Sequence, residues 1–167
     1  MSETWVIAPY FADKQDPDSV IFDHVWDFDL RNSTIAIGWN QLGDVSKLSK
    51  AELIYRYHIT HPNCTSGKAT HAVNMIWAFY HEIDLGDTII ARKGRKKIIG
   101  VGKVIGSPFY DVEQGICRVG NSDLHYYYPN FLPVQWQHRV KFFSQIIFSM
   151  STLYQISYGK SEFLLGE

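Results

Sequence analysis

The chain has 167 residues, 46% of them hydrophobic and 20% charged, which is the composition of an ordinary globular domain with a buried core. The 16 Lys and Arg against 17 Asp and Glu leave a net charge of −1, so a strongly basic nucleic-acid binder is excluded and any contact with DNA or RNA has to come from a local basic patch. No apolar run is long enough to cross a bilayer and the N-terminal region lacks a signal-peptide pattern, so we expect a soluble, cytoplasmic protein with no membrane partner.

The first half of the chain is punctuated by glycine, proline and acidic residues, and its apolar runs predict strands and helices. In chain order these are a strand at residues 5–8 closed by Pro9, a loop at 11–18, a short helix at 21–28, a strand at 34–37, a glycine-bracketed turn at 38–44, and a helix from Ser49 to about Tyr57. Ser49 and Glu52 have the spacing of a capping box, which predicts the start of the second helix.

The second half predicts one more helix, a hairpin and a late strand. In chain order these are a helix capped by Thr70 whose apolar stripe runs to Ile83, strands at 88–91 and 98–105 joined by a turn at 92–97, a long loop at 106–130, a strand at 132–136, and an apolar segment at 140–156 that is helical in its first part. Gly94 supplies the positive φ that the tight turn of the hairpin requires.

Strands separated by helices, with a hairpin late in the chain, predict the α/β (α+β) class and a small mixed β-barrel flanked by helices. A doubly wound dinucleotide fold is disfavoured, because Gly100 and Gly102 fall inside a strand and not at a strand-to-helix turn. We interpret these two glycines as places where other groups pack closely against the barrel backbone.

The hairpin turn gathers five cations in six residues: Arg92, Lys93, Arg95, Lys96 and Lys97. One interpretation is that they contact phosphates, which would give affinity without sequence selectivity. The alternative is a solvated turn that also protects a sheet edge with lysine. The sequence leaves both open.

Aromatic residues make up 15% of the chain, and Trp39 stands out among them because it directly follows a buried strand. An indole at that turn can stack on a flipped base, and Asn40 and Gln41 can read the edge of the base. The alternative is that Trp39 caps the barrel. Trp26 is a further candidate ring with a core position as its alternative, and the tyrosine-rich loop around Tyr126 to Tyr128 is typical of a recognition surface.

Catalytic and metal-binding patterns are weak in this sequence. The seven His are scattered without a metal-ligand spacing, no Gly-x-Ser-x-Gly elbow exists, and Cys64 and Cys117 lie far apart. We therefore expect a protein that is not an enzyme, with no metal, no cofactor and no catalytic residues.

Six segments in the same order resemble EVE-type domains of the PUA superfamily, which are close in fold to YTH domains. The segments are 5–9, 35–44, 77–79, 85–94, 99–104 and 134–136, so the resemblance covers about residues 5–140. It implies a single domain over 1–167 of the kind found at the N-terminus of McrB-like and other modification-dependent restriction proteins, where it is part of a longer chain.

The resemblance implies an aromatic cage for a modified base. Trp39 is similar to the cage Trp of YTH domains and Asn40 to the adjacent polar position, Pro9 and Tyr10 match the segment that lines the pocket, and Phe109 and Tyr110 are the implied source of a second ring. The implied partner is modified DNA with a flipped base such as N6-methyladenine or a 5-modified cytosine, together with a fused or associated nuclease or ATPase. An RNA-binding PUA/YTH-like module and a small-molecule or protein-interaction barrel are the alternatives.

Overall fold

A computed structural model describes residues 2–11, 19–120 and 125–166. The helices are α1 (Val20–Asn32), the 3-10 helix η1 (Asn40–Leu42), α2 (Lys50–Thr60), α3 (Ser66–His81), α4 (Val112–Arg118) and α5 (Tyr158–Leu165). The strands are β1 (Thr4–Ile7), β2 (Thr34–Ile37), β3 (Thr88–Lys93), β4 (Lys97–Val104), β5 (Phe109–Tyr110), β6 (Asn130–Gln137), β7 (Lys141–Phe142) and β8 (Leu153–Ile156).

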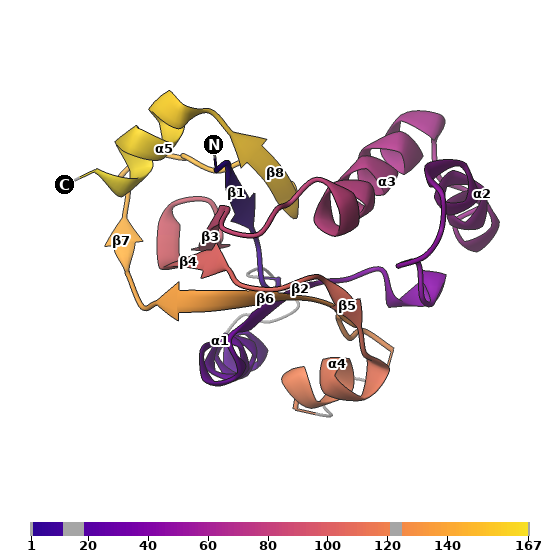
Figure 1. The fold of residues 1–167 in the computed structure, drawn as a ribbon, viewed down its shortest axis with the longest axis horizontal. Coiled ribbons are helices and arrows are strands. Elements are labelled where there is room, and N and C mark those ends of the chain that lie inside the picture. Colours follow the sequence, from indigo (N-terminus) through magenta and orange to yellow (C-terminus); the bar gives the residue numbers. More distant parts are fainter. Residues whose placement is uncertain (1, 12–18, 121–124, 167) are drawn as a thin grey trace.

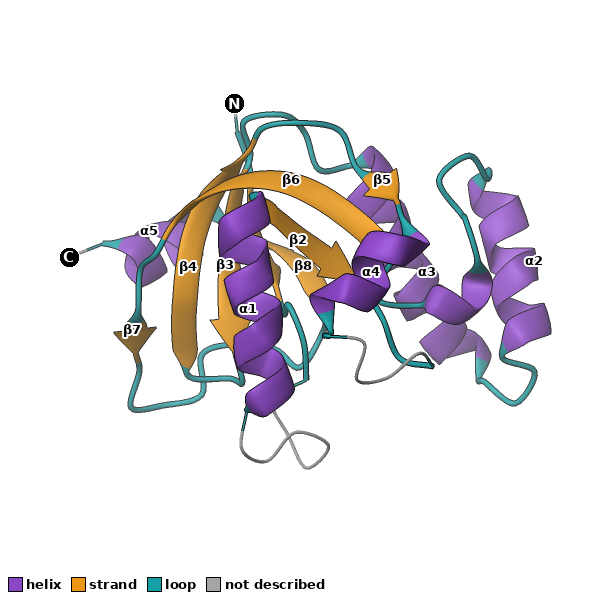
Figure 2. Cartoon of the chain, turned by 90° about the horizontal axis from the view of Figure 1, so that it is seen from below, coloured by secondary structure: helices purple, strands orange, loops and turns teal. Residues whose placement is uncertain are grey.

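The strands form one curled sheet in the order β2-β6-β4-β3-β1-β8, with β5 paired to β6 and β7 paired to β4. Strand β6 is long enough to pair with β2 through its first half and with β4 through its second half, and it bends between the two. The result is a half-barrel with α1 lying across it and with α2 and α3 side by side at one end (Figures 1 and 2). The predicted class, a small mixed barrel flanked by helices, is confirmed.

Three apolar clusters hold these layers together. The largest lies between the sheet and α1 and contains Trp5, Ile7 and Phe22, while Val6 points to the opposite face of β1 and packs with Leu164 of α5. A separate cluster joins α2, α3 and η1. Both faces of β1 are therefore buried, which explains why its sequence reads as a continuous apolar run and not as an alternating one.

Local signals predicted the element starts with mixed success. The capping box is present, since Ser49 accepts from Glu52 N and the Glu52 carboxylate accepts from Ser49 N. The prediction that Thr70 caps the next helix is wrong, because the Thr65 side chain accepts from Lys68 N and the helix begins at Ser66.

Two predicted segments differ from the structure. The expected loop at 106–130 contains β5 and α4, and the N-cap Asp111 of α4 accepts from Gln114 N. Residues 121–124 of this loop lie outside the described part of the chain, and so do residues 12–18 of the expected loop at 11–18. The apolar segment 140–156 is not helical: it supplies β7 and β8, and the last helix starts only at Tyr158. Periodicity in a short apolar run does not separate a buried strand from a helix, so pairing with β1 and β4 decided the outcome.

Gly102 and Gly100 are confirmed as points of close approach. A Cβ at Gly102 would lie 2.5 Å from Val134 Cγ1 and 2.7 Å from the carbonyl oxygen of Gln135, and one at Gly100 would lie 2.5 Å from the Trp26 ring.

Because alanine at Gly102 would overpack this contact, we expect Gly102→Ala to lower the free energy of unfolding by about 1–3 kcal/mol, as measured by urea denaturation. Gly67→Ala is the matched control: nothing lies within 4 Å of a Cβ there, and alanine should stabilise α3 by about 0.5–1 kcal/mol. Equal effects of the two changes would contradict this assignment.

Candidate functional site

The registers of β1, β3 and β8 bring three chain segments to one edge of the sheet. β1 runs parallel to β3, with Ile7 opposite Ala91, and antiparallel to β8, with Ile7 opposite Leu153. The residues after β1, the hairpin turn after β3 and the residues before β8 therefore meet. The backbone N–H of Ala8 donates to the carbonyl of Thr152 at 2.9 Å, which continues the pairing past the strand end.

The end of β2 is held at the same region by Asn130, a fully buried residue at the start of β6. Its Nδ2 donates to the carbonyl oxygen of Gly38 at 2.7 Å, and its Oδ1 accepts from the hydroxyl of Tyr80. The Tyr128 ring packs directly on Gly38, where a Cβ would come within 3.2 Å of it. The Asn130 amide and the Tyr128 ring thus fix the backbone that leads into Trp39.

Trp39 adopts a left-handed conformation with φ of 61°, which is uncommon for a bulky residue and turns the chain sharply after β2. Its half-buried ring packs against both the sheet cluster and the α2–α3 cluster. Burial raises the pKa of the neighbouring Tyr57 hydroxyl, and a hydrogen bond from the Trp39 side chain opposes that rise. The indole is therefore anchored at one side and not buried outright.

A pocket of about 300 Å³ opens beside Trp39. Its aromatic walls are Phe11, Trp39, Tyr126 and Tyr128, and its polar rim is Asn40, Gln41, His61 and Thr152. This volume is at the lower end of the range for small-molecule sites, and walls of rings with a few polar groups are their usual composition.

A second hollow, of about 380 Å³, adjoins this pocket. The two share Phe11, Tyr128 and Thr152, so one ridge of side chains separates them. The lining of the second hollow includes Arg92 and Arg95 from the hairpin. The structure thus places an aromatic pocket and two guanidinium groups next to each other.

The site residues expected from the sequence are partly brought together. Trp39 and Asn40 line the aromatic pocket, and Asn40 Nδ2 donates to the carbonyl of His125 at 2.9 Å. Tyr10 lines the adjoining hollow, with its ring centroid 5.5 Å from that of Tyr128. Pro9 is buried, and its carbonyl oxygen accepts from Arg118 Nη2 at 2.9 Å.

Three candidate rings lie elsewhere. Phe109 stacks on Phe131 at 5.4 Å, and Tyr110 follows it on β5, outside the lining of both hollows. Trp26 is in the core, edge-on to Trp136 at 5.0 Å. The pocket rings opposite Trp39 come instead from Phe11 and the expected tyrosine loop. Phe11 and Thr152 carried no signal in the sequence, because strand register alone brings them to the site.

The five hairpin cations have different surroundings. Arg92 is 6% exposed, and its guanidinium donates to the carbonyls of Gly94 and Ser151. Arg95 is exposed, and its Nε donates to the carbonyl of Phe148 at 2.8 Å. Lys93 lies 3.7 Å from the Asp23 carboxylate and over the Phe22 ring, and Lys97 lies over Phe142. Lys96 is exposed at the tip. Of the five, Arg92 and Arg95 face the hollow beside the pocket.

A buried ion pair between Arg118 and Asp29, which the sequence did not reveal, lies next to the pocket residue Tyr128. Arg118 of α4 and Asp29 of α1 are both 0% exposed and joined by two hydrogen bonds of 2.9 and 2.7 Å. The guanidinium also donates to Pro9 and lies 5.5 Å from the centre of the Tyr128 ring. This one side chain therefore connects the wall residue Tyr128 and the segment that leads into Tyr10 and Phe11 to helices α1 and α4.

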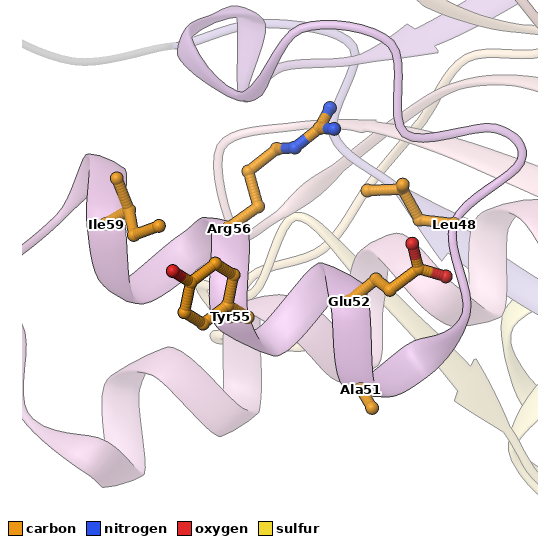
Figure 3. Close-up of a pocket in the computed structure, with 6 residues that line it drawn as sticks. All are labelled: Leu48, Ala51, Glu52, Tyr55, Arg56 and Ile59. Carbon is orange, nitrogen blue, oxygen red and sulfur yellow. The ribbon is translucent and has the colours of Figure 1, made fainter.

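A further hollow of about 400 Å³ lies on the outer face of α2 (Figure 3). It is lined by Leu48, Ala51, Glu52, Tyr55, Arg56 and Ile59. Arg56 Nη1 donates to the carbonyls of Leu42 and Asp44, so this nitrogen is already engaged within the fold and the hollow presents mainly exposed apolar groups. It is separate from the Trp39 pocket.

The described residues also bear on metal sites, disulfides and membrane-spanning helices. They contain no group of three or more His, Cys, Asp or Glu arranged to hold a metal ion. Cys64 and Cys117 are free thiols. Across the same described ranges, none of the helices has both the length and the apolar character needed to span a bilayer.

Comparison with known proteins gives a family but no described relative. No curated protein matches the chain. Residues 19–157, from the residue before α1 to the residue after β8, match the sequence profile of a domain of unknown function, DUF8426. Since this match spans most of the 167 residues, the chain belongs to the DUF8426 family.

Proposed function

We propose that this chain is a non-catalytic reader domain that binds modified DNA by accepting one flipped, modified base into the pocket beside Trp39. The observation that carries the proposal is the ring-walled pocket that shares a ridge with a hollow bearing two guanidinium groups. The ordered resemblance to EVE-type domains supports it. In this proposal the base is N6-methyladenine or a 5-modified cytosine, and the domain directs a restriction or defence protein with a nuclease or ATPase partner in the cytoplasm.

Each part of the pocket has a role in the proposal. Trp39 stacks on the base, which contributes about 1–3 kcal/mol and offsets the cost of unstacking a base from the duplex, a few kcal/mol. Asn40 and Gln41 on the rim read its hydrogen-bonding edge. Phe11, Tyr126 and Tyr128 exclude water and surround the added methyl group.

The test is a binding panel of matched short duplexes that carry N6-methyladenine, 5-methylcytosine, 5-hydroxymethylcytosine, 4-methylcytosine or no mark. We expect one mark to bind more tightly than the unmarked duplex by at least about fourfold, the value of burying one methyl group. Fluorescence anisotropy at two salt concentrations measures both affinity and its salt dependence. Equal affinity for all duplexes contradicts the proposal.

Two further arms separate the alternative functions. Tighter binding of a matched single-stranded RNA with the same mark would assign the pocket to RNA, because single strands present a base without the cost of flipping. Binding that does not depend on salt, or no binding at all, would favour a small-molecule or protein-interaction barrel.

A further inference from the structure

The second hollow bears a concentration of positive charge that the described residues leave uncompensated. Arg92 and Arg95 both line it. Among residues 2–11, 19–120 and 125–166, the carboxylates pair with Arg31, Lys93 and Arg118 and with neither of these two guanidinium groups. Two neighbouring cations that find no counter-ion among these described residues repel each other, so an anion in the hollow would stabilise both.

The buried member of the pair is incompletely satisfied. Arg92 is 6% exposed, and its Nη1 and Nη2 donate to carbonyls of Gly94 and Ser151, but its buried Nε has no partner within the described chain. Burial is the main cause that lowers the pKa of Arg92; the neighbouring Tyr154 opposes this shift, and the charge of Arg95 adds to it. Neutral carbonyls thus hold the guanidinium group in place, and none of the described carboxylates forms an ion pair with it.

The position of the hollow limits which anion fits. It shares Phe11, Tyr128 and Thr152 with the aromatic pocket, so a group bound in it lies one ridge away from a base stacked on Trp39. In a nucleic-acid strand, the charged group nearest to a base is the phosphodiester of the same nucleotide, which the sugar joins to the base. The exposed tip residue Lys96 does not line the hollow.

We propose that the hollow lined by Arg92 and Arg95 binds the phosphodiester flanking the flipped base, so that the two cavities together recognise one whole nucleotide. This inference rests on the proposed function, because it takes the neighbouring pocket to hold a base. Arg92 positions the hollow from beneath, and Arg95, at the surface, contacts the phosphate oxygens. The other hairpin cations act only through the general field of the turn.

Arg95→Gln and Lys96→Gln form a matched pair of test variants. Each removes one positive charge from the same turn, and glutamine at 95 can still donate to the Phe148 carbonyl. On short duplexes carrying a central N6-methyladenine or 5-methylcytosine, Arg95→Gln should weaken binding at least about tenfold and lower the salt slope by about one, whereas Lys96→Gln should weaken it less than about threefold. Thermal unfolding of both variants checks that the fold is unchanged.

A neutral methylphosphonate placed at one phosphate after another on the marked strand locates the contact. In the wild-type protein, one position beside the mark should cost about tenfold in affinity, and in Arg95→Gln the same position should cost less than about twofold. Equal losses of affinity in Arg95→Gln and Lys96→Gln would overturn the phosphate site even if base preference persists. The same holds if no methylphosphonate position lowers the affinity of the wild-type protein. If Arg95→Gln loses more affinity than Lys96→Gln but the wild-type protein shows no preference for a marked base, the base pocket is overturned and the phosphate site remains. If no duplex binds, both proposals fail.

Discussion

Trp39→Ala is expected to abolish the preference for a marked base and to weaken binding of the marked duplex by roughly 5- to 150-fold, the equivalent of about 1–3 kcal/mol of stacking. The indole supplies one wall of the pocket, and alanine leaves that side open to water. Anisotropy titrations with marked and unmarked duplexes measure the ratio of the two affinities, which should approach one in the variant.

Trp39 also packs against two clusters, so its removal affects the fold as well as the pocket. Tyr126→Ala provides the independent variant, because this ring lines the pocket and is 56% exposed. Its loss should reduce the preference with little change in unfolding temperature. Tyr55→Ala, on the outer face of α2, removes a ring that is 70% exposed and lies outside the pocket, and it should leave binding unchanged. Unaltered preference in both Trp39→Ala and Tyr126→Ala would remove the pocket from the proposal.

Arg118→Ala is expected to have the largest effect on stability, a loss of about 3–5 kcal/mol in the free energy of unfolding. The change leaves the Asp29 carboxylate fully buried with Thr34 as its remaining hydrogen-bond donor, and it frees the Pro9 carbonyl. Urea denaturation followed by circular dichroism measures the loss. Binding should fall with it, because Pro9 and Tyr128 then lose a common support.

The loss should also depend on pH. Burial raises the pKa of Asp29 above 3.8, and the charge of Arg118 opposes that rise. Without the arginine the folded-state pKa rises further above the unfolded value, so the variant takes up a proton on folding. Its stability therefore decreases as the pH rises through the folded-state pKa, and the difference from wild type should be smaller at a pH of about 5 than at about 8.

Two controls isolate the buried ion pair. Arg31→Ala removes an exposed partner of Asp27 on α1 and should cost about 0.5 kcal/mol or less, since both side chains are more than half exposed. The double change Asp29→Leu with Arg118→Met should recover most of the stability, because it leaves no unpaired charge in the interior. If Arg118→Ala costs no more than Arg31→Ala, the buried ion pair does not stabilise the fold.

The sequence by itself determined the elements whose signals are local. The strand at 34–37 has the predicted bounds, and the Ser49–Glu52 capping box starts its helix as predicted because backbone and side-chain donors within three residues decide it. The hairpin around Gly94, with φ of 65°, and the close packing at Gly100 and Gly102 were predicted for the same reason: turn conformation and missing side chains are properties of single positions.

Only the tertiary structure decided which residues meet at the site. Trp39, Asn40 and Tyr10 were recognised in the sequence, but Phe11 and Thr152 reach the pocket because β1 pairs with β8 over a separation that no local pattern encodes. The register of β6 against β2 likewise sets Tyr128 on Gly38, and chain topology joins Arg118 to Asp29. Pairing with β4 and β1 likewise made strands of Lys141–Phe142 and Leu153–Ile156 within the expected helical segment. Packing against Phe131 and Trp136 holds Phe109 and Trp26 away from the pocket, because burial against distant partners outweighs local propensity. Tyr110 follows Phe109 on β5, outside the lining of the pocket.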